Sequence, residues 1–336
     1  MNCKHNNVEP VRLGLIGAGQ NAGGHARAFI KQPGANLVAI ADPVTEKAES
    51  LAAETGARPC RDFSEFLDEV DAVVISSPSF LHLEQVAKIT EAGKAMLIEK
   101  PMATTLGDAI EVERLVRDAG LPSYVGFSMS SVPYARECFR ALEDGRIGKP
   151  RSLTAHRHLY LDPAQTADWL LDGKVSGGMM LEMNIHEIEF LMRAGGPVKT
   201  VDARTALEDP AYPRMSDHCY ALLEFESGAT GIHEGGWKSP LTSFYKCVIG
   251  DKGCLYTNQW GNEIFYEQVG KDRTEVKAER FDKQRHFLDV VRGAARSEAD
   301  VTWSLEVHFV VEAILESARI RQPVELATFK KEAHHG

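Results

Sequence analysis

A run of small residues near the start of the chain has the spacing of a dinucleotide-binding turn. Gly17, Gly19 and Ala22 fill the three positions of the GxGxxG/A pattern, after an apolar run and before a helical one. The first glycine permits a tight turn, the second lets the backbone approach a pyrophosphate, and the following helix offers free N–H groups. We therefore predict a nucleotide site; the alternative is a glycine-rich turn that binds no nucleotide.

An acidic residue after the second apolar run indicates which nucleotide binds. Asp42 stands 20 residues beyond Ala22, at the end of the segment LVAIAD. A carboxylate at this position accepts hydrogen bonds from the adenosine ribose and repels a 2′-phosphate. We predict NAD as the cofactor. NADP is less favoured, although neighbouring loops can override this preference.

Three later segments give the chain a resemblance to a known family. They are SPSFLH at residues 77–82, EKP at residues 99–101 and GGMMLEMNIH at residues 177–186. With the glycine-rich turn, they resemble the motifs of the glucose-fructose oxidoreductase, inositol dehydrogenase and rhizopine-catabolism (Gfo/Idh/MocA) family of NAD(P)-dependent oxidoreductases. In that family they read (T/S)Px3H, EKP and GGx3Dx3H. The resemblance covers residues 11 to about 191 in order.

The resemblance implies which residues contact the cofactor. In that family the (T/S)Px3H segment packs along the nucleotide, and EKP places a lysine beside the nicotinamide. The cofactor contacts expected from the turn and these segments are Gly17, Gly19, Gln20, Asn21, Ala22, Asp42, Ser76, Ser77, Pro78, His82, Glu99 and Lys100.

The third segment departs from the family pattern at two positions. Glu182 stands where the family usually has aspartate, and Asn184 stands where it commonly has glycine. Glutamate keeps the negative charge but its longer side chain moves the carboxylate. We expect the shape of the substrate to differ accordingly.

Oxidation of a secondary alcohol needs a base for the hydroxyl proton and a positive group beside the reacting oxygen, while hydride leaves for nicotinamide C4. We predict that His186 is the base and that Lys100 stabilises the developing alkoxide. Glu182 lies four residues before His186, on the same helical face, where it can orient the imidazole. The reverse assignment, with Lys100 as the base, stays open.

The segment HRHLYLDPAQTADWL mixes aromatic, basic and acidic side chains, as a sugar pocket does. We expect Arg157, Tyr160 and Trp169 to contact substrate together with Lys100, Glu182 and His186; the alternative for the first three is ordinary packing. His156 and His158 share one face of a strand but lack the further ligands of a zinc site. We therefore expect no metal.

Two kinds of domain must position these residues. Up to Phe127, short apolar runs alternate with helical stretches, which is typical of a doubly wound parallel sheet. Strand-like segments with glycine turns follow, with helices expected at 132–142, 180–193, 283–292 and 305–320. We predict an α/β protein, with a Rossmann domain over residues 1–127 and an α+β domain with a large, open, mainly antiparallel sheet over residues 128–336.

Composition limits the partners. A formal net charge of −10 and the lack of a long basic run argue against nucleic acid. No window is long and apolar enough to span a bilayer, and the N-terminal stretch lacks the apolar core of a signal peptide. Six cysteines without a CxxC pair are typical of a reduced compartment. We expect a cytoplasmic protein.

The predicted function is reversible alcohol–ketone chemistry on a sugar, a glycoside or an inositol-like cyclic polyol. Two alternatives stay open: a redox-neutral enzyme that uses bound NAD to cleave a glycoside, and an NAD-binding regulator without activity. The resemblance also implies that the open face of the second sheet is buried in a homodimer or homotetramer.

Overall fold

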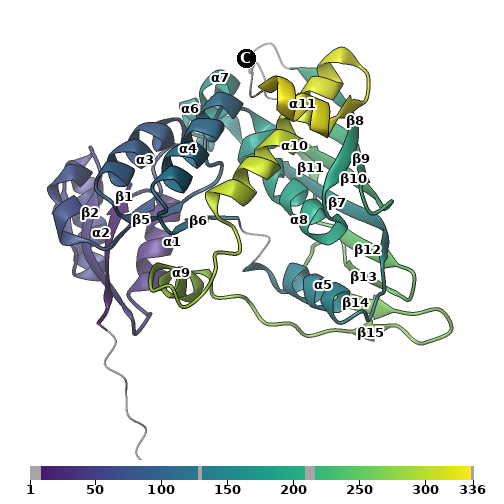
Figure 1. Ribbon diagram of the computed structural model, residues 1–336, viewed down its shortest axis with the longest axis horizontal. Helices are drawn as coiled ribbons and strands as arrows, with labels where there is room; N and C mark the ends of the chain where they lie inside the picture. Colours follow the sequence, from purple (N-terminus) through teal and green to yellow (C-terminus); the bar gives the residue numbers. More distant parts are fainter. Residues whose placement is uncertain (1–8, 128–130, 209–215, 334–336) are drawn as a thin grey trace, which may run out of the picture. The chain divides into compact units, whose positions relative to one another are not determined.

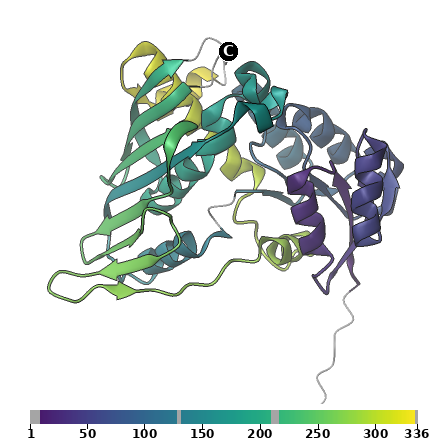
Figure 2. The same cartoon turned by 180° about the vertical axis from the view of Figure 1, so that it is seen from behind.

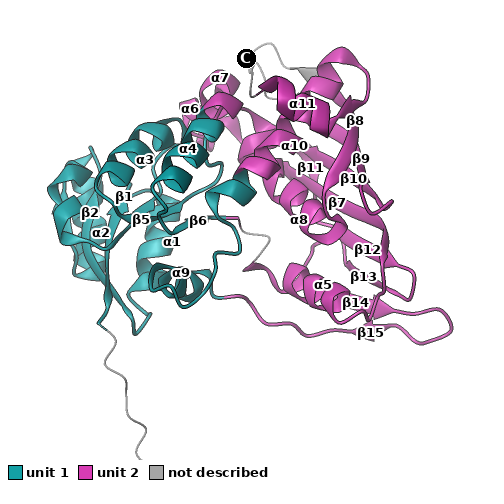
Figure 3. Cartoon of the chain, viewed as in Figure 1, with its two compact units in different colours: residues 1–103, 108–126, 282–304 teal, residues 104–107, 127–281, 305–336 magenta. Residues whose placement is uncertain are grey.

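The computed structural model describes residues 9–127, 131–208 and 216–333, and the chain divides into two compact units (Figure 3). Unit 1 comprises residues 1–103, 108–126 and 282–304, and unit 2 comprises residues 104–107, 127–281 and 305–336. This division is more complex than the expected single boundary after residue 127. The reason is that residues 282–304 return to unit 1, where Val125 N donates a hydrogen bond to Ala299 O.

Unit 1 contains a six-stranded sheet in the order β3-β2-β1-β4-β5-β6, in which every neighbouring pair is parallel. Its strands are β1 (Val11–Ile16), β2 (Ala35–Ala41), β3 (Arg58–Cys60), β4 (Ala72–Ile75), β5 (Ala95–Ile98) and β6 (Ser123–Val125). The strand order reverses between β1 and β4, which is the doubly wound arrangement. Ligands of such sheets bind beyond the carboxyl ends of the strands, so the loops that follow β1, β4 and β5 are the ones to inspect.

Helices connect and cover this sheet (Figure 1). They are α1 (Gln20–Phe29), α2 (Thr45–Thr55), α3 (His82–Glu91), α4 (Leu106–Asp118) and α9 (Lys283–Val291), with 3-10 turns at Phe63–Glu65, Leu67–Glu69 and Ser79–Leu81. The strands β4 and β5 are buried on both faces, which explains their continuous apolar sequence. Helix α9 packs on α1 through the rings of Phe29 and Phe287, whose centroids are 6.2 Å apart.

Unit 2 contains a ten-stranded mixed sheet in the order β15-β14-β13-β12-β7-β10-β9-β8-β16, with β11 also paired to β7. Its strands are β7 (Pro150–Tyr160), β8 (Val198–Glu208), β9 (Ser216–Phe225), β10 (Thr230–Gly236), β11 (Lys238–Ser243), β12 (Lys246–Gly250), β13 (Cys254–Thr257), β14 (Ile264–Glu267), β15 (Thr274–Glu275) and β16 (Val324–Glu325). Among the described strands of this sheet, only β7 and β10 pair in parallel, so the prediction of a mainly antiparallel sheet is confirmed.

The helices of unit 2 form a layer on one face of this sheet (Figures 1 and 2). They are α5 (Pro133–Glu143), α6 (Asp168–Leu171), α7 (Gly173–Ser176), α8 (Ile185–Gly195), α10 (Val301–Ile320) and α11 (Leu326–Ala333), with a 3-10 turn at Pro163–Gln165. A π-helical turn, Met180–Asn184, leads directly into α8. The helical segment predicted over residues 180–193 is therefore confirmed, although its first turn is π-helical. None of the described helices has the length and apolar character of a membrane span.

Candidate active site

The glycine-rich turn of unit 1 has the geometry of a phosphate cradle. Gly17 has φ +93°, and a Cβ there would lie 2.6 Å from Ser76 O, so no other residue fits. A Cβ on Gly19 would meet nothing within 4 Å, which leaves space in front of the N-terminus of α1. A cavity of about 450 Å³ extends from Ala18, Gly19 and Gln20 along the groove between α1 and α2. The turn therefore has the shape that a pyrophosphate requires.

Asp42 follows the end of β2 and is fixed beside this turn. Its Oδ2 accepts the backbone N–H of Ala18 at 2.8 Å, and its Oδ1 accepts that of Val44 at 2.9 Å. A carboxylate oxygen has more than one lone pair, so both oxygens keep capacity for a hydroxyl group. The carboxylate of Asp42 thus lies next to the glycine-rich turn, as the sequence predicted.

The loop after β4 carries the SPSFLH segment. Ser77 Oγ donates to Gln85 Oε1 at 2.6 Å, whereas Ser76 Oγ is buried with no hydrogen-bond partner among the described residues. His82 is buried, with Nδ1 3.0 Å from Pro101 O and Nε2 3.2 Å from Ser77 O. Burial lowers the pKa of His82, which favours the neutral ring. His82 therefore ties this loop to EKP, and its expected contact with the cofactor stays a prediction.

Glu99 of EKP is the centre of a buried network in unit 1. Its Oε1 lies 2.7 Å from His25 Nε2 and 3.7 Å from Lys283 Nζ, and its Oε2 accepts the backbone N–H of Lys100 at 3.3 Å. Burial alone would raise the pKa of Glu99, but the hydrogen bond from His25 and the charges of Lys283, His25 and Lys100 lower it to about 2. This carboxylate is therefore ionised and holds the backbone of Lys100.

Two members of this network were not predicted from the sequence. His25 lies on α1, three residues beyond Ala22 of the fingerprint, and this i, i+3 spacing was the available signal. Lys283 lies on α9, in the segment that returns to unit 1. Gln284 Nε2 also approaches His25 Nδ1 at 3.5 Å. Helix α9 is far from residue 99 along the chain, so no local sequence pattern predicted that Lys283 would approach Glu99.

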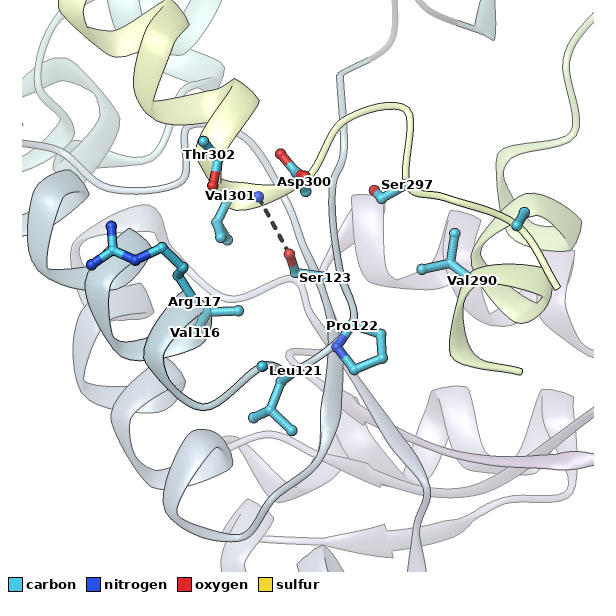
Figure 4. Close-up of a pocket in the computed structure, with 12 residues that line it drawn as sticks. Val116, Arg117, Leu121, Pro122, Ser123, Val290, Ser297, Asp300, Val301 and Thr302 are labelled. Atoms are coloured by element: carbon cyan, nitrogen blue, oxygen red, sulfur yellow. Dashed lines mark hydrogen bonds between the residues drawn. The ribbon is translucent and has the colours of Figure 1, made fainter. Parts of the chain in front are cut away.

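A second cavity of unit 1, of about 360 Å³, lies at the edge strand β6 (Figure 4). Ser123 Oγ accepts the backbone N–H of Val301 at 3.3 Å across it. Arg117 makes an ion pair with Glu113 at 2.6 Å. Gly120, Leu121 and Pro122 of the cavity lining precede β6, so the cavity lies at the amino end of that strand and not at the carboxyl edge where doubly wound sheets bind ligands.

In unit 2, Glu182 and His186 lie on consecutive turns of one helical segment and are both buried. Glu182 belongs to the π-helical turn, an irregularity that is frequent at functional sites. The edge of the His186 ring meets Phe127, with centroids 6.4 Å apart and an interplanar angle of 82°. Gly177 has φ +83°, and a Cβ there would lie 2.7 Å from Thr104 O. The glycine at position 177 thus lets the chain before the π-helical turn approach the backbone of Thr104 closely.

Asn184, the second departure from the family pattern, is fully buried. A Cβ added at Gly235 would lie only 2.2 Å from Asn184 Nδ2, so a side chain at position 235 would clash with Asn184. Neither amide atom has a hydrogen-bond partner among the described residues. The chain therefore accommodates this larger side chain through a glycine on β10.

The three predicted substrate residues occupy different places in unit 2. Arg157 lies on β7 with its Nη1 3.6 Å from Glu187 Oε1, on the face covered by α8. Tyr160 is exposed at the end of β7, and Trp169 is half-buried on α6. Their role in binding stays a prediction.

The HxH pair lies on the opposite face of β7. His156 Nε2 and His158 Nε2 lie 3.5 and 3.3 Å from the two carboxylate oxygens of Glu234 on β10. Across the described ranges, no group of three or more His, Cys, Asp or Glu side chains could hold a metal ion. These histidines therefore contact a neighbouring strand on the uncovered side of the sheet.

Comparison with known proteins extends these observations. Residues 11–127 match the sequence model of the oxidoreductase family with an NAD-binding Rossmann fold, and residues 135–256 match the GFO/IDH/MocA C-terminal domain. The chain is 27% identical to scyllo-inositol 2-dehydrogenase (NAD(+)) of Bacillus subtilis strain 168, over 94% of this chain and 96% of that protein. It is 32% identical to inositol 2-dehydrogenase of Rhizobium meliloti strain 1021, over 66% of this chain and 67% of that protein.

A solved structure supports the fold over nearly the whole chain. The WlbA dehydrogenase from Bordetella pertussis, crystallised with NADH and UDP-GlcNAcA, superposes with a TM-score of 0.83 at 25% identity. The match covers 94% of this chain and 99% of that one. Both predicted domain types are thus found, in the same order, in a dehydrogenase of known structure.

Proposed function

Because the chain belongs to the GFO/IDH/MocA family of oxidoreductases with an NAD-binding Rossmann fold, we propose that it interconverts a secondary alcohol and a ketone on a sugar, a glycoside or a cyclic polyol. One observation carries this proposal. The buried carboxylate of Glu99 is bound by His25 of the fingerprint helix and holds the backbone of Lys100. A lysine is thereby fixed at the carboxyl end of β5, the edge where doubly wound sheets bind their ligands.

The residues of the turn fit NAD. The backbone from Gly17 to Ala22 would hold the pyrophosphate, with Gln20 and Asn21 at the N-terminus of α1. The oxygens of Asp42 would accept the ribose hydroxyls, which favours NAD over NADP. Ser76, Ser77 and Pro78 would line the nucleotide after β4. When bound, NAD accepts a hydride from the carbinol carbon.

The chain's own residues supply the proton chemistry. His186 would take the hydroxyl proton, and the Lys100 ammonium would donate a hydrogen bond to the reacting oxygen as negative charge develops. Glu182 would orient the imidazole, while the edge contact with Phe127 fixes the plane of the ring. In the reverse reaction, His186 would return the proton to the alkoxide.

A substitution separates the two assignments of Lys100. Arginine stays protonated, so Lys100→Arg can stabilise an alkoxide but cannot act as a base. If His186 is the base, this variant keeps part of the activity and the pH profile of kcat/KM stays that of the wild type. If Lys100 is the base, Lys100→Arg is as inactive as Lys100→Ala.

The main test is the formation of NADH with NAD and a panel of inositols, aldoses and glycosides. We expect turnover with at least one member and a loss of about 10²–10⁴-fold in kcat for both Lys100→Ala and His186→Ala. Lys31→Ala, at an exposed lysine of the same unit, is the control and should match the wild type. Release of product without free NADH would contradict the proposal in favour of redox-neutral chemistry.

We also propose that the uncovered face of the unit 2 sheet forms a homodimer or homotetramer. Leu222 on β9 and Ile232 on β10 are direct cross-strand partners, and both are exposed. Tyr220 and Ile249 are exposed on the same face. An apolar patch of this kind is typical of a protein interface. Light scattering should give the wild type a mass that is a multiple of the chain mass, and Leu222→Glu a smaller mass. A monomeric wild type would contradict the proposal.

A further inference from the structure

A cavity in unit 2 has not been accounted for by the proposed chemistry. It measures about 180 Å³ and lies between α5, α8 and the strands β7, β12 and β13. Arg157, Glu187 and Lys246 line it, as do the aromatic rings of Tyr134, Phe244 and Trp260. Buried charges together with aromatic walls are the usual features of a site for a polar small molecule.

Two charges of this cavity, Glu187 and Lys246, are deeply buried, Arg157 is half-buried, and the three are incompletely paired. The Glu187 side chain is wholly buried, and both cations approach its Oε1, Lys246 Nζ at 3.2 Å and Arg157 Nη1 at 3.6 Å. These are ion-pair distances, but neither carboxylate oxygen meets the geometry of a hydrogen bond to any described residue. Arg157 Nε is likewise buried without a partner. Such atoms cost free energy unless a ligand satisfies them.

The surroundings fix these side chains in place. The Lys246 ammonium also lies 3.4 Å from Phe244 O, and the Arg157 guanidinium lies 5.6 Å from the centroid of the Phe244 ring. Burial lowers the pKa of Lys246, while the charge of Glu187 opposes this shift. The hydroxyl of Tyr134 donates to Leu255 O, so this residue presents its ring as a wall. The site is therefore built before any ligand binds.

The donors and acceptors select the class of ligand. An anion would pair with Arg157 and Lys246 but would be repelled by Glu187, and a cation would meet the opposite difficulty. A neutral vicinal diol satisfies both, since each hydroxyl group can donate to a carboxylate oxygen and accept from a guanidinium or an ammonium. Trp260, 58% exposed at the cavity, offers an apolar face to the C–H surface of a ring.

We propose that Glu187, Arg157 and Lys246 form a subsite that binds a vicinal diol of the substrate, remote from the reacting carbon. This proposal rests on the proposed function, because it takes the ligand to be the polyol substrate. Glu187 directly follows His186 on α8, so one turn of helix carries both the expected base and the diol subsite. The subsite would thus select substrates that are hydroxylated at more than one carbon.

The experiment measures binding to the full-length, NADH-loaded protein by calorimetry, because an alcohol cannot be oxidised in that complex. The probes are scyllo-inositol, trans-1,2-cyclohexanediol and cyclohexanol. We expect the wild type to bind the two diols and to bind cyclohexanol at least about tenfold more weakly, since a site built for hydroxyl groups rejects an analogue that lacks one. Equal affinity for the diol and for cyclohexanol would overturn the proposal.

The variants are Glu187→Gln and the double variant Glu187→Gln/Lys246→Met, which removes both charges and keeps the cavity filled. Each should bind scyllo-inositol at least about tenfold more weakly, with NADH affinity unchanged. The exposed Glu226→Gln is the matched control and should bind as the wild type does. Wild-type affinity in the double variant would overturn the subsite, and so would a wild type that binds neither diol.

Activity measurements distinguish a failure of the subsite from a failure of the proposed function. If the protein oxidises scyllo-inositol and the double variant keeps the wild-type KM, the subsite is wrong and the dehydrogenase function stands. If diol binding is lost in the variants but no panel member forms NADH, the subsite stands and the dehydrogenase function is wrong. A merely structural ion pair would change stability without this dependence on the hydroxyl groups of the probe.

Discussion

Two buried glutamates, one in each unit, have opposite surroundings. Glu99 receives a hydrogen bond at each carboxylate oxygen, from His25 and from the backbone of Lys100, and Lys283 adds a positive charge. Glu187 has two cations near one oxygen, yet it has no hydrogen bond within the described structure. Both carboxylates lie in the interior, but only the first has its polar requirements met.

The difference indicates different uses for the same side chain. A carboxylate with all its partners in place is held rigidly and can position what it touches, which here is the backbone of Lys100. A carboxylate with unused acceptor sites costs free energy in the unliganded protein, and a ligand with hydroxyl groups can recover that cost. The network around Glu99 is therefore structural, and the cavity around Glu187 is suited to binding.

The largest expected effect is on stability, for Glu99→Ala. This change leaves the buried His25 and the half-buried Lys283 without their carboxylate, and breaking the buried pair of Glu99 and His25 costs about 3–5 kcal/mol. Urea unfolding at pH 7, followed by circular dichroism, measures it. Glu226→Gln serves as the control, and a loss below about 1 kcal/mol for Glu99→Ala would contradict the structural role.

The second effect is a loss of stability in acid. Because the pKa of Glu99 falls to about 2 on folding, from an ordinary value of 4.5, its contribution is present above pH 4.5 and is lost as the pH falls toward 2. That contribution is about 3 kcal/mol. The wild type should therefore lose more stability between pH 5 and 2 than Glu99→Gln, as measured by urea midpoints.

Two buried histidines, His233 and His308, also make the free energy of unfolding depend on pH in this acid range. Burial lowers the pKa of His233 and of His308 to about 4, so both favour the unfolded chain as the pH drops below about 6.5. They act equally in the wild type and in Glu99→Gln. The difference between the two proteins reports Glu99 together with its partner His25, and parallel curves would show that the pKa of Glu99 is not lowered.

Local patterns were enough to predict much of unit 1. The glycine spacing and the acid after β2 depend on residues within one βαβ unit, and the structure places Gly17, Gly19 and Asp42 together as expected. The segments SPSFLH and EKP follow the neighbouring parallel strands β4 and β5, so both lie at the same edge of the sheet. The strand β3 was not predicted, because three residues give no usable periodicity.

Long-range packing could not be predicted in the same way. Lys283 reaches Glu99 from the far end of the chain, and Lys246 reaches Glu187 from another strand of the sheet. Neither pair has a spacing signal, since each depends on how helices and strands pack in three dimensions. The π-helical turn at Met180–Asn184 also has the apolar periodicity of an ordinary helix, so the sequence predicted a helical segment but not its π-helical turn.

A smaller effect is expected for Lys246→Met. The change removes one of the two cations near Glu187, but Arg157 stays as a counter-charge at 3.6 Å. We expect a loss of about 2 kcal/mol, below the value for Glu99→Ala, because breaking a buried pair is milder when a second partner remains. Urea unfolding under the same conditions measures the difference. A loss as large as that of Glu99→Ala would show that Glu187 depends on Lys246 for its structure.

The smallest effect on stability is expected for Glu187→Gln/Lys246→Met, and it is the sharpest contrast with Glu99. Removing both members of a buried ion pair is often neutral, because the desolvation penalty disappears with the attraction. Arg157 also loses its counter-charge in this variant, but its side chain is 22% exposed and water can solvate it. We therefore expect the free energy of unfolding to change by less than about 1 kcal/mol while diol binding is lost. Glu99→Gln/His25→Leu, which removes the corresponding pair of unit 1, should instead destabilise the protein by about 2 kcal/mol or more. The reason is that Glu99 accepts buried hydrogen bonds from His25 and from the Lys100 N–H, which are then lost or weakened, whereas Glu187 accepts none among the described residues. Equal losses in the two double variants would show that both glutamates are structural.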